Sequence, residues 1–164
     1  MQSAKDTFFL HLRDRLQQIN PQRTVALNGS TRPALVVVEN EPPAALLPDV
    51  FYLRWLNTRV LAHSHPGMRP LLALDAAISY STRGNAGAQH VDRGRALAQL
   101  DLELLAMCVA GAAPKIDATQ SPPVALNSSL VWAAPHLNAI EAEGDELRRA
   151  ATLTILFFPE VDLA

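Results

Sequence analysis

Residues 72–80 read LALDAAISY, and this stretch decides the fold class. Apolar side chains occupy every second position: Leu72, Leu74, Ala76, Ile78 and Tyr80. Asp75 and Ser79 stand between them. Successive side chains of a β-strand point to opposite faces, so the pattern predicts a strand with one buried and one wet face. The polar residues 82–89, with two glycines, predict a loop after it.

Two amphipathic helices are expected on either side of this strand in the sequence. In the first segment, apolar residues recur at three- and four-residue spacing: Phe8, Leu12, Leu16 and Ile19. Ser3 or Asp6 is expected to cap its start, and Asn20-Pro21 to end it. A second helix is predicted over residues 92–109, with Leu97, Leu100 and Leu104 in its buried stripe and Gly111 as its stop.

Four further strands are predicted over residues 34–38, 50–61, 129–134 and 151–158. Proline-rich residues 40–49 and 111–128 are interpreted as irregular loops, and the acidic residues 141–146 as a solvated excursion between the last two strands. The order is therefore α-β-β-β-α-β-β. Strands in runs favour an α+β domain over residues 1–164, with a mixed, mainly antiparallel sheet flanked by two helices.

Length and composition set the class of protein. The chain has 164 residues, 49% hydrophobic and 18% charged, which suits one domain with a real core. A single cysteine, Cys108, excludes an internal disulfide and suits a reducing compartment. Charged residues interrupt the first 19 positions, so no signal peptide is expected, and no apolar run approaches the roughly 20 residues of a membrane span. The expected location is the cytosol.

Charge is distributed unevenly along the chain. Residues 50–95 hold six arginines and two aspartates, a net charge of +4, whereas residues 96–164 hold three basic and nine acidic side chains, a net charge of −6. One interpretation is that these charges interleave on one surface. The other is that they form two faces that meet head to tail between subunits.

No catalytic or metal-binding motif emerges from the sequence. His63 and His65 form an H-x-H pair beside a turn, but a metal site needs at least three ligands, and His11, His90, His136 and Asp75 show no motif spacing. Cys108 lies on the apolar stripe of the second helix, as a core thiol would. Asp101 and Glu103 are two residues apart and should point to different sides, so no carboxylate pair is expected. No metal and no cofactor are predicted.

Aromatic residues near arginines allow two interpretations. Arg54 and Arg59 lie among Phe51, Tyr52 and Trp55, which is compatible with phosphate or nucleic-acid binding but fits strand packing equally well. Trp55 and Trp132 are expected in the core, and an exposed one would be a candidate partner contact.

Four stretches resemble the tail terminator, or tail completion, proteins of long-tailed bacteriophages and tail-like injection systems. They are residues 7–12 (TFFLHL), the alternating strand 72–80 with its polar loop, residues 92–101 (DRGRALAQLD) leading into a leucine-rich helix, and the late strand 152–158 (TLTILFF). Together they cover about half of the chain. The proline-rich stretches depart from the family pattern as additions.

The resemblance implies a structural protein, not an enzyme, that assembles in the host cytoplasm and then becomes part of a virion or tail-like particle. It implies a hexameric ring that caps the tail tube and joins it to a head-side connector, without membrane contact or direct nucleic-acid recognition. Residues 83–90 and 141–146 are the expected interface loops. The candidate residues for subunit or partner contacts are Arg54, Arg59, Arg83, Asn85, His90, Arg93, Glu141, Glu143, Asp145 and Glu146.

Two other functions stay open from the sequence. The first is a small cytosolic adaptor domain that holds one protein or peptide partner, which an exposed apolar groove on a monomer would favour. The second is an enzyme whose site is not recognisable in the sequence. Its residues would have to converge in one pocket, and the candidates are His63, His65, His90, Asp75 and Asp92.

Overall fold

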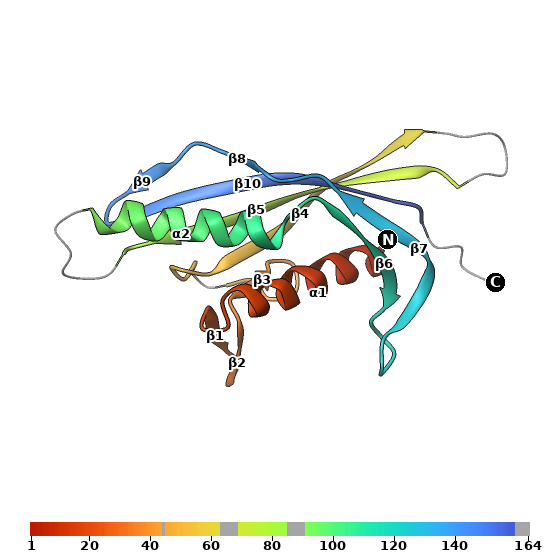
Figure 1. Ribbon diagram of the computed structural model, residues 1–164, viewed down its shortest axis with the longest axis horizontal. Coiled ribbons are helices and arrows are strands. Elements are labelled where there is room, and N and C mark those ends of the chain that lie inside the picture. The colour runs from red at the N-terminus through yellow and green to blue at the C-terminus, as the bar shows by residue number, and fades with distance from the viewer. Residues whose placement is uncertain (44, 63–68, 85–90, 160–164) are drawn as a thin grey trace.

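The computed structural model describes residues 1–43, 45–62, 69–84 and 91–159. It is an α+β fold with two helices and a curled, mostly antiparallel sheet (Figure 1). In chain order the elements are α1 (Gln2–Ile19), β1 (Thr24–Leu27), β2 (Ser30–Pro33), β3 (Leu35–Val37), β4 (Phe51–Ala62), β5 (Leu71–Thr82), α2 (Asp92–Met107), β6 (Gly111–Asp117), β7 (Val124–Trp132), β8 (His136–Leu137), β9 (Glu141–Glu143) and β10 (Glu146–Phe157).

Three 12-residue strands, β4, β5 and β10, form the middle of the main sheet. The strand order is β3-β4-β5-β10-β7-β6, and the short strands β8 and β9 also pair with β10. β3 runs parallel to β4, whereas every other described pair is antiparallel. The prediction of a mixed, mainly antiparallel sheet is therefore confirmed.

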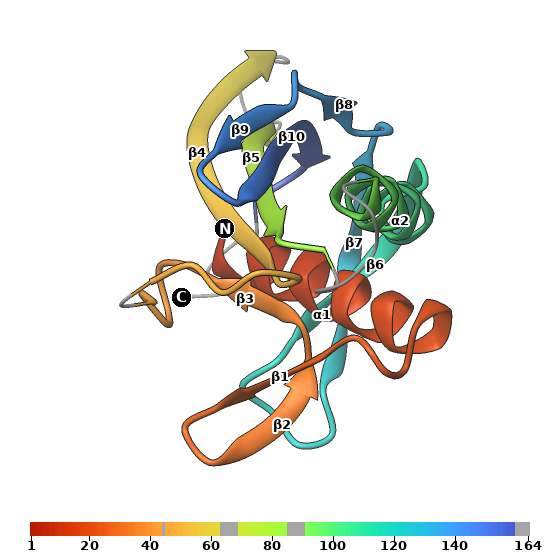
Figure 2. The same ribbon diagram turned by 90° about the vertical axis from the view of Figure 1, so that its left-hand side faces the viewer.

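The core lies between one face of this sheet and the two helices (Figure 2). Along β5, Leu74, Ala76, Ile78 and Tyr80 are buried on that face, while Asp75 and Ser79 on the other face are partly exposed. The period of two in residues 72–80 thus corresponds to the two faces of the strand, as predicted. Helix α1 contributes four fully buried side chains, Ala4, Phe8, Leu12 and Leu16.

The helix ends differ from the sequence prediction in three places. Ser3 and Asp6 do not cap α1, because the helix begins at Gln2 and both lie inside it. Gly111 does not stop α2, which ends at Met107 with Cys108 as its C-cap. Gly111 instead opens β6 opposite Trp132. The end of α1 at Ile19, before Asn20-Pro21, agrees with the prediction.

The predicted irregular connection over residues 111–128 is wrong, because most of it forms the β6–β7 hairpin. The sequence did not predict these strands because prolines and small residues, which are common in them, are typical of loops. Pro114 is tolerated because β6 is an edge strand, where a missing N–H removes no ladder bond on the outer side. The described residues of 40–49 contain neither helix nor strand, as predicted.

The β1–β2 hairpin was not predicted, although the sequence carries a signal for it. Asn28 and Gly29 both have positive φ, at 49° and 78°, which suits the two-residue turn that Asn-Gly favours between antiparallel strands. This hairpin leads into a second, smaller apolar cluster made of Val25, Ala34, Val36, Val50 and Tyr52.

Candidate assembly interface

The acidic residues 141–146 form part of a tight hairpin between β9 and β10. β9 consists of Glu141–Glu143, Gly144 turns with φ of 57°, and β10 begins at Glu146. The last strand therefore begins five residues earlier than predicted, because its charged first residues pair with β5 and β9. Propensity alone had marked this segment as loop.

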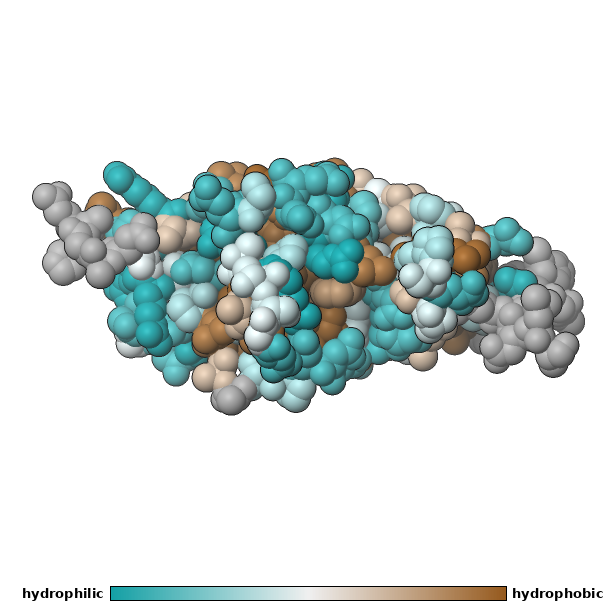
Figure 3. Space-filling view, turned by 90° about the horizontal axis from the view of Figure 1, so that it is seen from below, coloured by the Kyte–Doolittle hydropathy of each residue, from teal (hydrophilic) through white to brown (hydrophobic). Residues whose placement is uncertain are grey.

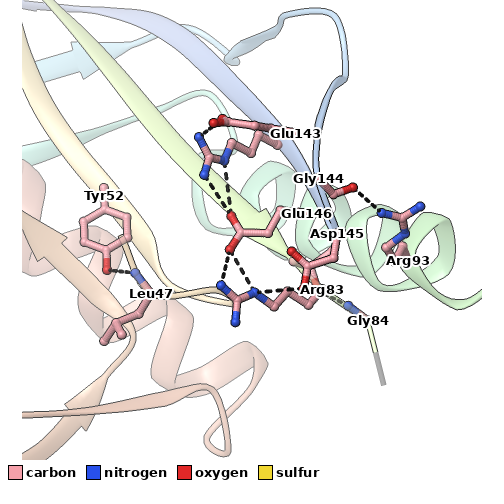
Figure 4. Close-up of polar contacts among 11 residues, drawn as sticks. Leu47, Tyr52, Arg83, Gly84, Arg93, Glu143, Gly144, Asp145 and Glu146 are labelled. Carbon is pink, nitrogen blue, oxygen red and sulfur yellow. Dashed lines mark hydrogen bonds and ion pairs between the residues drawn. The ribbon is translucent and has the colours of Figure 1, made fainter. Parts of the chain in front are cut away.

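Three arginines converge on this turn: Arg83 directly after β5, Arg93 of α2 and Arg148 of β10 (Figure 4). Arg83 contacts Glu146 at 2.9 Å and lies 3.7 Å from Asp145. Arg148 donates to Glu146 at 3.1 and 3.2 Å and also pairs with Glu143. Burial of the Glu146 side chain would raise its pKa, but the hydrogen bonds from Arg83 and Arg148 outweigh it and lower the pKa.

These contacts change the expected roles of the basic and acidic loops. Arg83 and the acidic turn were predicted to meet between subunits, but the structure brings them together within one chain. Arg93 also braces this turn, since its guanidinium donates to the carbonyl of Gly144 at 3.3 Å. Asn85 and His90 lie outside the described residues.

The other two candidate arginines lie on the outer half of β4. β3 pairs with β4 only at residues 51–53, and within the described part of the chain residues 54–62 pair with β5 alone. Arg59 contacts Asp75 through two hydrogen bonds of 2.9 and 3.1 Å. These bonds, with one from Thr154, lower the pKa of Asp75. Arg54 is exposed and has no ion-pair partner among the described residues.

Large apolar side chains are exposed on the same half-strand. Leu56, Val60 and Leu61 are 47%, 50% and 47% exposed. The alternation of the strand breaks here, with register shifts after Trp55 and Val60, and residues 56–61 are all exposed. We call residues 54–62 the β4 arm. The Thr58 hydroxyl on this arm donates to the sulfur of Met1 at 3.5 Å.

The arm and the acidic turn lie at opposite ends of the molecule. Figure 1 shows the paired ends of β4 and β5 extending to one side along the longest axis, with β9 near the other end. On the underside, hydrophobic atoms form separate patches among hydrophilic ones (Figure 3). The sequence had given a sign of the arm: the period of two stops at Trp55, and the run Leu56-Asn57-Thr58-Arg59-Val60-Leu61 follows no core pattern.

The possible catalytic residues do not come together in the part of the chain that is described. His63, His65 and His90 lie outside it. Asp75 lines a cavity of about 460 Å³ with His136, whereas Asp92 lines a different one of about 320 Å³. Within the described ranges, no group of three or more His, Cys, Asp or Glu side chains could hold a metal ion.

Both tryptophans and Cys108 are buried, as predicted, whereas Ile19 at the end of the apolar stripe of α1 is 40% exposed. Trp55 and Trp132 belong to the main core, so neither is an exposed anchor. Cys108 is fully buried, which raises the pKa of its thiol to about 12. Asp101 and Glu103 have different partners, since Asp101 accepts from Tyr80 at 2.5 Å and Glu103 from Arg23 at 2.8 Å. They form no carboxylate pair.

Comparison with protein-family models and with curated protein sequences finds no match to this chain. Among the described residues, no helix is long and apolar enough to cross a membrane.

Proposed function

We propose that the chain is a structural assembly protein of the tail-terminator type. Its copies form a homo-oligomeric ring that contacts tube subunits on one side and a head-side connector on the other. In this role it uses no substrate and no cofactor, and it acts by binding through loops and strand edges. The particle would be a virus tail or a tail-like injection device.

The observation that carries this proposal is the β4 arm. It combines three half-exposed apolar side chains with a strand edge that, within the described chain, pairs on one side only. Such an edge is a template for pairing with another chain, and soluble monomers usually cover or interrupt it. An exposed apolar segment beside an open edge therefore supports a role in contact with other protein chains. The resemblance of the four sequence stretches supports the ring in particular.

The test is the native mass in solution across protein concentration and salt, measured by analytical ultracentrifugation, with electron microscopy of the same samples. We expect a closed oligomer, six subunits by the resemblance, that forms as concentration rises and weakens as salt screens its charges. Monomers at every concentration, without rings on the grids, would contradict the proposal.

A second candidate function has its own supporting observation. A largely apolar cavity of about 590 Å³ lies between the β1–β2 hairpin and the proline-rich loop, lined in part by Leu27, Val36, Leu47 and Tyr52. Its size and lining suit an apolar side chain of a peptide partner, as an adaptor domain would require. A strict monomer that loses a peptide ligand upon Leu47→Glu substitution would favour this alternative, because Leu47 lines the cavity and is 42% exposed.

A further inference from the structure

Among the open strand edges of the described chain, two lie far apart (Figure 1). The first is the β4 arm. The second is β9, which pairs with β10 alone and whose residues Glu141, Ala142 and Glu143 are all exposed. Open edges satisfy their N–H and C=O groups with water or with a strand from another chain.

We propose that β9 of one copy adds to the β4 arm of the next copy, with Glu141 opposite Leu56 and diagonal to Arg54, because β3 already pairs with residues 51–53. This inference rests on the proposed ring and names the contact that builds it. Main-chain hydrogen bonds between the two edges would give affinity, and the side chains would select the partner. The occupant of the arm is thus a second copy of this chain.

Charge complementarity supports this pairing. Arg54 and Glu141 are exposed, and neither has an ion-pair partner among the described residues. On the arm, Asp75 neutralises Arg59, so Arg54 leaves a net positive charge. In the acidic turn, four carboxylates face three guanidiniums, those of Arg83, Arg93 and Arg148, so one negative charge is left over. Opposite charges on neighbouring strands attract, whereas like charges repel.

The arrangement of the two edges allows the contact. The edges lie toward opposite ends of the longest axis (Figure 1), as a head-to-tail contact between copies requires. The pairs β4–β5, β5–β10 and β10–β9 are all antiparallel, so β9 runs opposite to β4 within one chain. A neighbouring copy that keeps the same orientation would therefore present β9 antiparallel to the arm.

Other edges of a second copy fit the arm less well. The edge of β6 has Pro114, which lacks an N–H, and the N–H of Ile116 already donates to the Thr7 hydroxyl at 2.9 Å. Pairing of two β4 arms would bring the Arg54 side chains of both copies, unpaired among the described residues, into one patch, where they would repel. The acidic β9 edge avoids both problems.

The test is a charge swap in the full chain, read as the concentration at which half of the protein is assembled. We expect Arg54→Glu and Glu141→Arg each to raise this concentration about tenfold or more, as charge pairs of this kind do when one partner is reversed. The double variant R54E/E141R should return to within about threefold of the wild type, because the pair is restored with reversed signs. Arg95→Glu is the matched control: it gives the same net charge as R54E at an exposed site on α2 and should change nothing.

Circular dichroism and thermal melting of each variant separate misfolding from loss of assembly. If the wild type forms rings while R54E and E141R assemble like R95E, the strand contact is refuted and the proposed function stands. If both single variants lose assembly and the double variant does not recover, the pairing of these two residues is refuted. If the wild type never assembles, both the contact and the ring are refuted.

Disulfide trapping tests the two edges directly. Leu56→Cys protein is mixed with Glu141→Cys protein and oxidised, with the buried Cys108 present in both. Cross-linked pairs should form in the mixture and not in either variant alone, because a disulfide needs Cα atoms within about 7 Å. Cross-linking of L56C with itself would show two β4 arms in contact and overturn the inference.

Discussion

Replacing Glu103 should reduce the stability of the fold more than replacing any surface carboxylate. Its side chain on α2 is only 1% exposed and accepts hydrogen bonds from three residues. Arg23 donates at 2.8 and 3.1 Å, Asn20 at 2.8 Å and Gln99 at 3.1 Å. This carboxylate therefore ties the end of α1 and the chain after it to α2.

The size of the stability loss depends on Arg23, the charged partner that stays in the protein when Glu103 is removed. Removing one member of a buried ion pair costs about 3–5 kcal/mol, because the other charge stays poorly solvated. The Arg23 side chain is 18% exposed and lies 3.8 Å from Asp49, so the lower end applies. Glu103→Ala should lower the free energy of unfolding by about 3 kcal/mol. For a chain of this size that corresponds to a fall in Tm of about 6–12 °C.

The pH dependence gives a second readout. Burial alone would raise the pKa of Glu103, but the hydrogen bonds from Arg23, Asn20 and Gln99 outweigh it, and the pKa lies below its ordinary value of 4.5. A depressed folded-state pKa stabilises the protein above the unfolded-state pKa, and this contribution is lost as pH falls through the folded-state pKa. The stability difference between wild type and Glu103→Gln should be constant near neutral pH and shrink below about pH 4.5.

Urea denaturation followed by circular dichroism measures both effects. Glu39→Ala is the control, because Glu39 pairs with Lys5 at the surface and should cost at most about 1 kcal/mol. Replacing both partners, as in R23M/E103L, should cost less than Glu103→Ala, since no buried charge is left unpaired. This account would be refuted if Glu103→Ala lowered the free energy of unfolding by less than about 1 kcal/mol. It would also be refuted if the stability difference between the wild type and Glu103→Gln did not change with pH.

Three further predictions concern the core. Burial raises the pKa of the Cys108 thiol to about 12, so this thiol should not react with a thiol reagent at pH 8 in the native protein. It should react fully in urea, and an absorbance titration measures both reactions. Thr7→Val should cost about 1–3 kcal/mol in urea denaturation, because it leaves the Ile116 N–H without its acceptor, whereas Thr24→Val at an exposed position should not. Phe8→Ala should lower the free energy of unfolding by about 3–5 kcal/mol, measured by the same method. Phe8 is fully buried, and its ring packs edge-on against that of Trp132 with 5.4 Å between the ring centroids. A smaller loss would show that neighbouring side chains move to fill the cavity.

The long, regular elements were predictable because their patterns depend on neighbours close in sequence. The period of two over residues 72–80 and the helical spacing of Phe8, Leu12 and Leu16 report which side of each element is buried. Both patterns are the same whichever helix or strand packs against the apolar face, so they can be recognised without knowledge of the tertiary structure. The α+β class followed from them, together with the burial of Cys108.

The elements that were missed have no such local pattern. β6 and the first residues of β10 are strands because β7, β5 and β9 lie beside them, although Pro114 and the charged residues after Glu146 disfavour that conformation locally. The interface prediction failed in part for the same reason. The sequence places Arg83 and Glu146 63 residues apart, and only the β5–β10 pairing brings them within 2.9 Å.

The sequence by itself thus determined the class of fold, the two helices, the buried stripe of each long element and the imbalance of charge between the middle and the end of the chain. Only the tertiary structure decided which charges are neutralised within the chain and which strand edge is left open. Arg54 and Arg83 look alike in sequence, but β5 carries Arg83 to the acidic turn while Arg54 lies on the uncovered arm. The physical reason is that pairing between distant strands, not local propensity, determines which polar groups have partners.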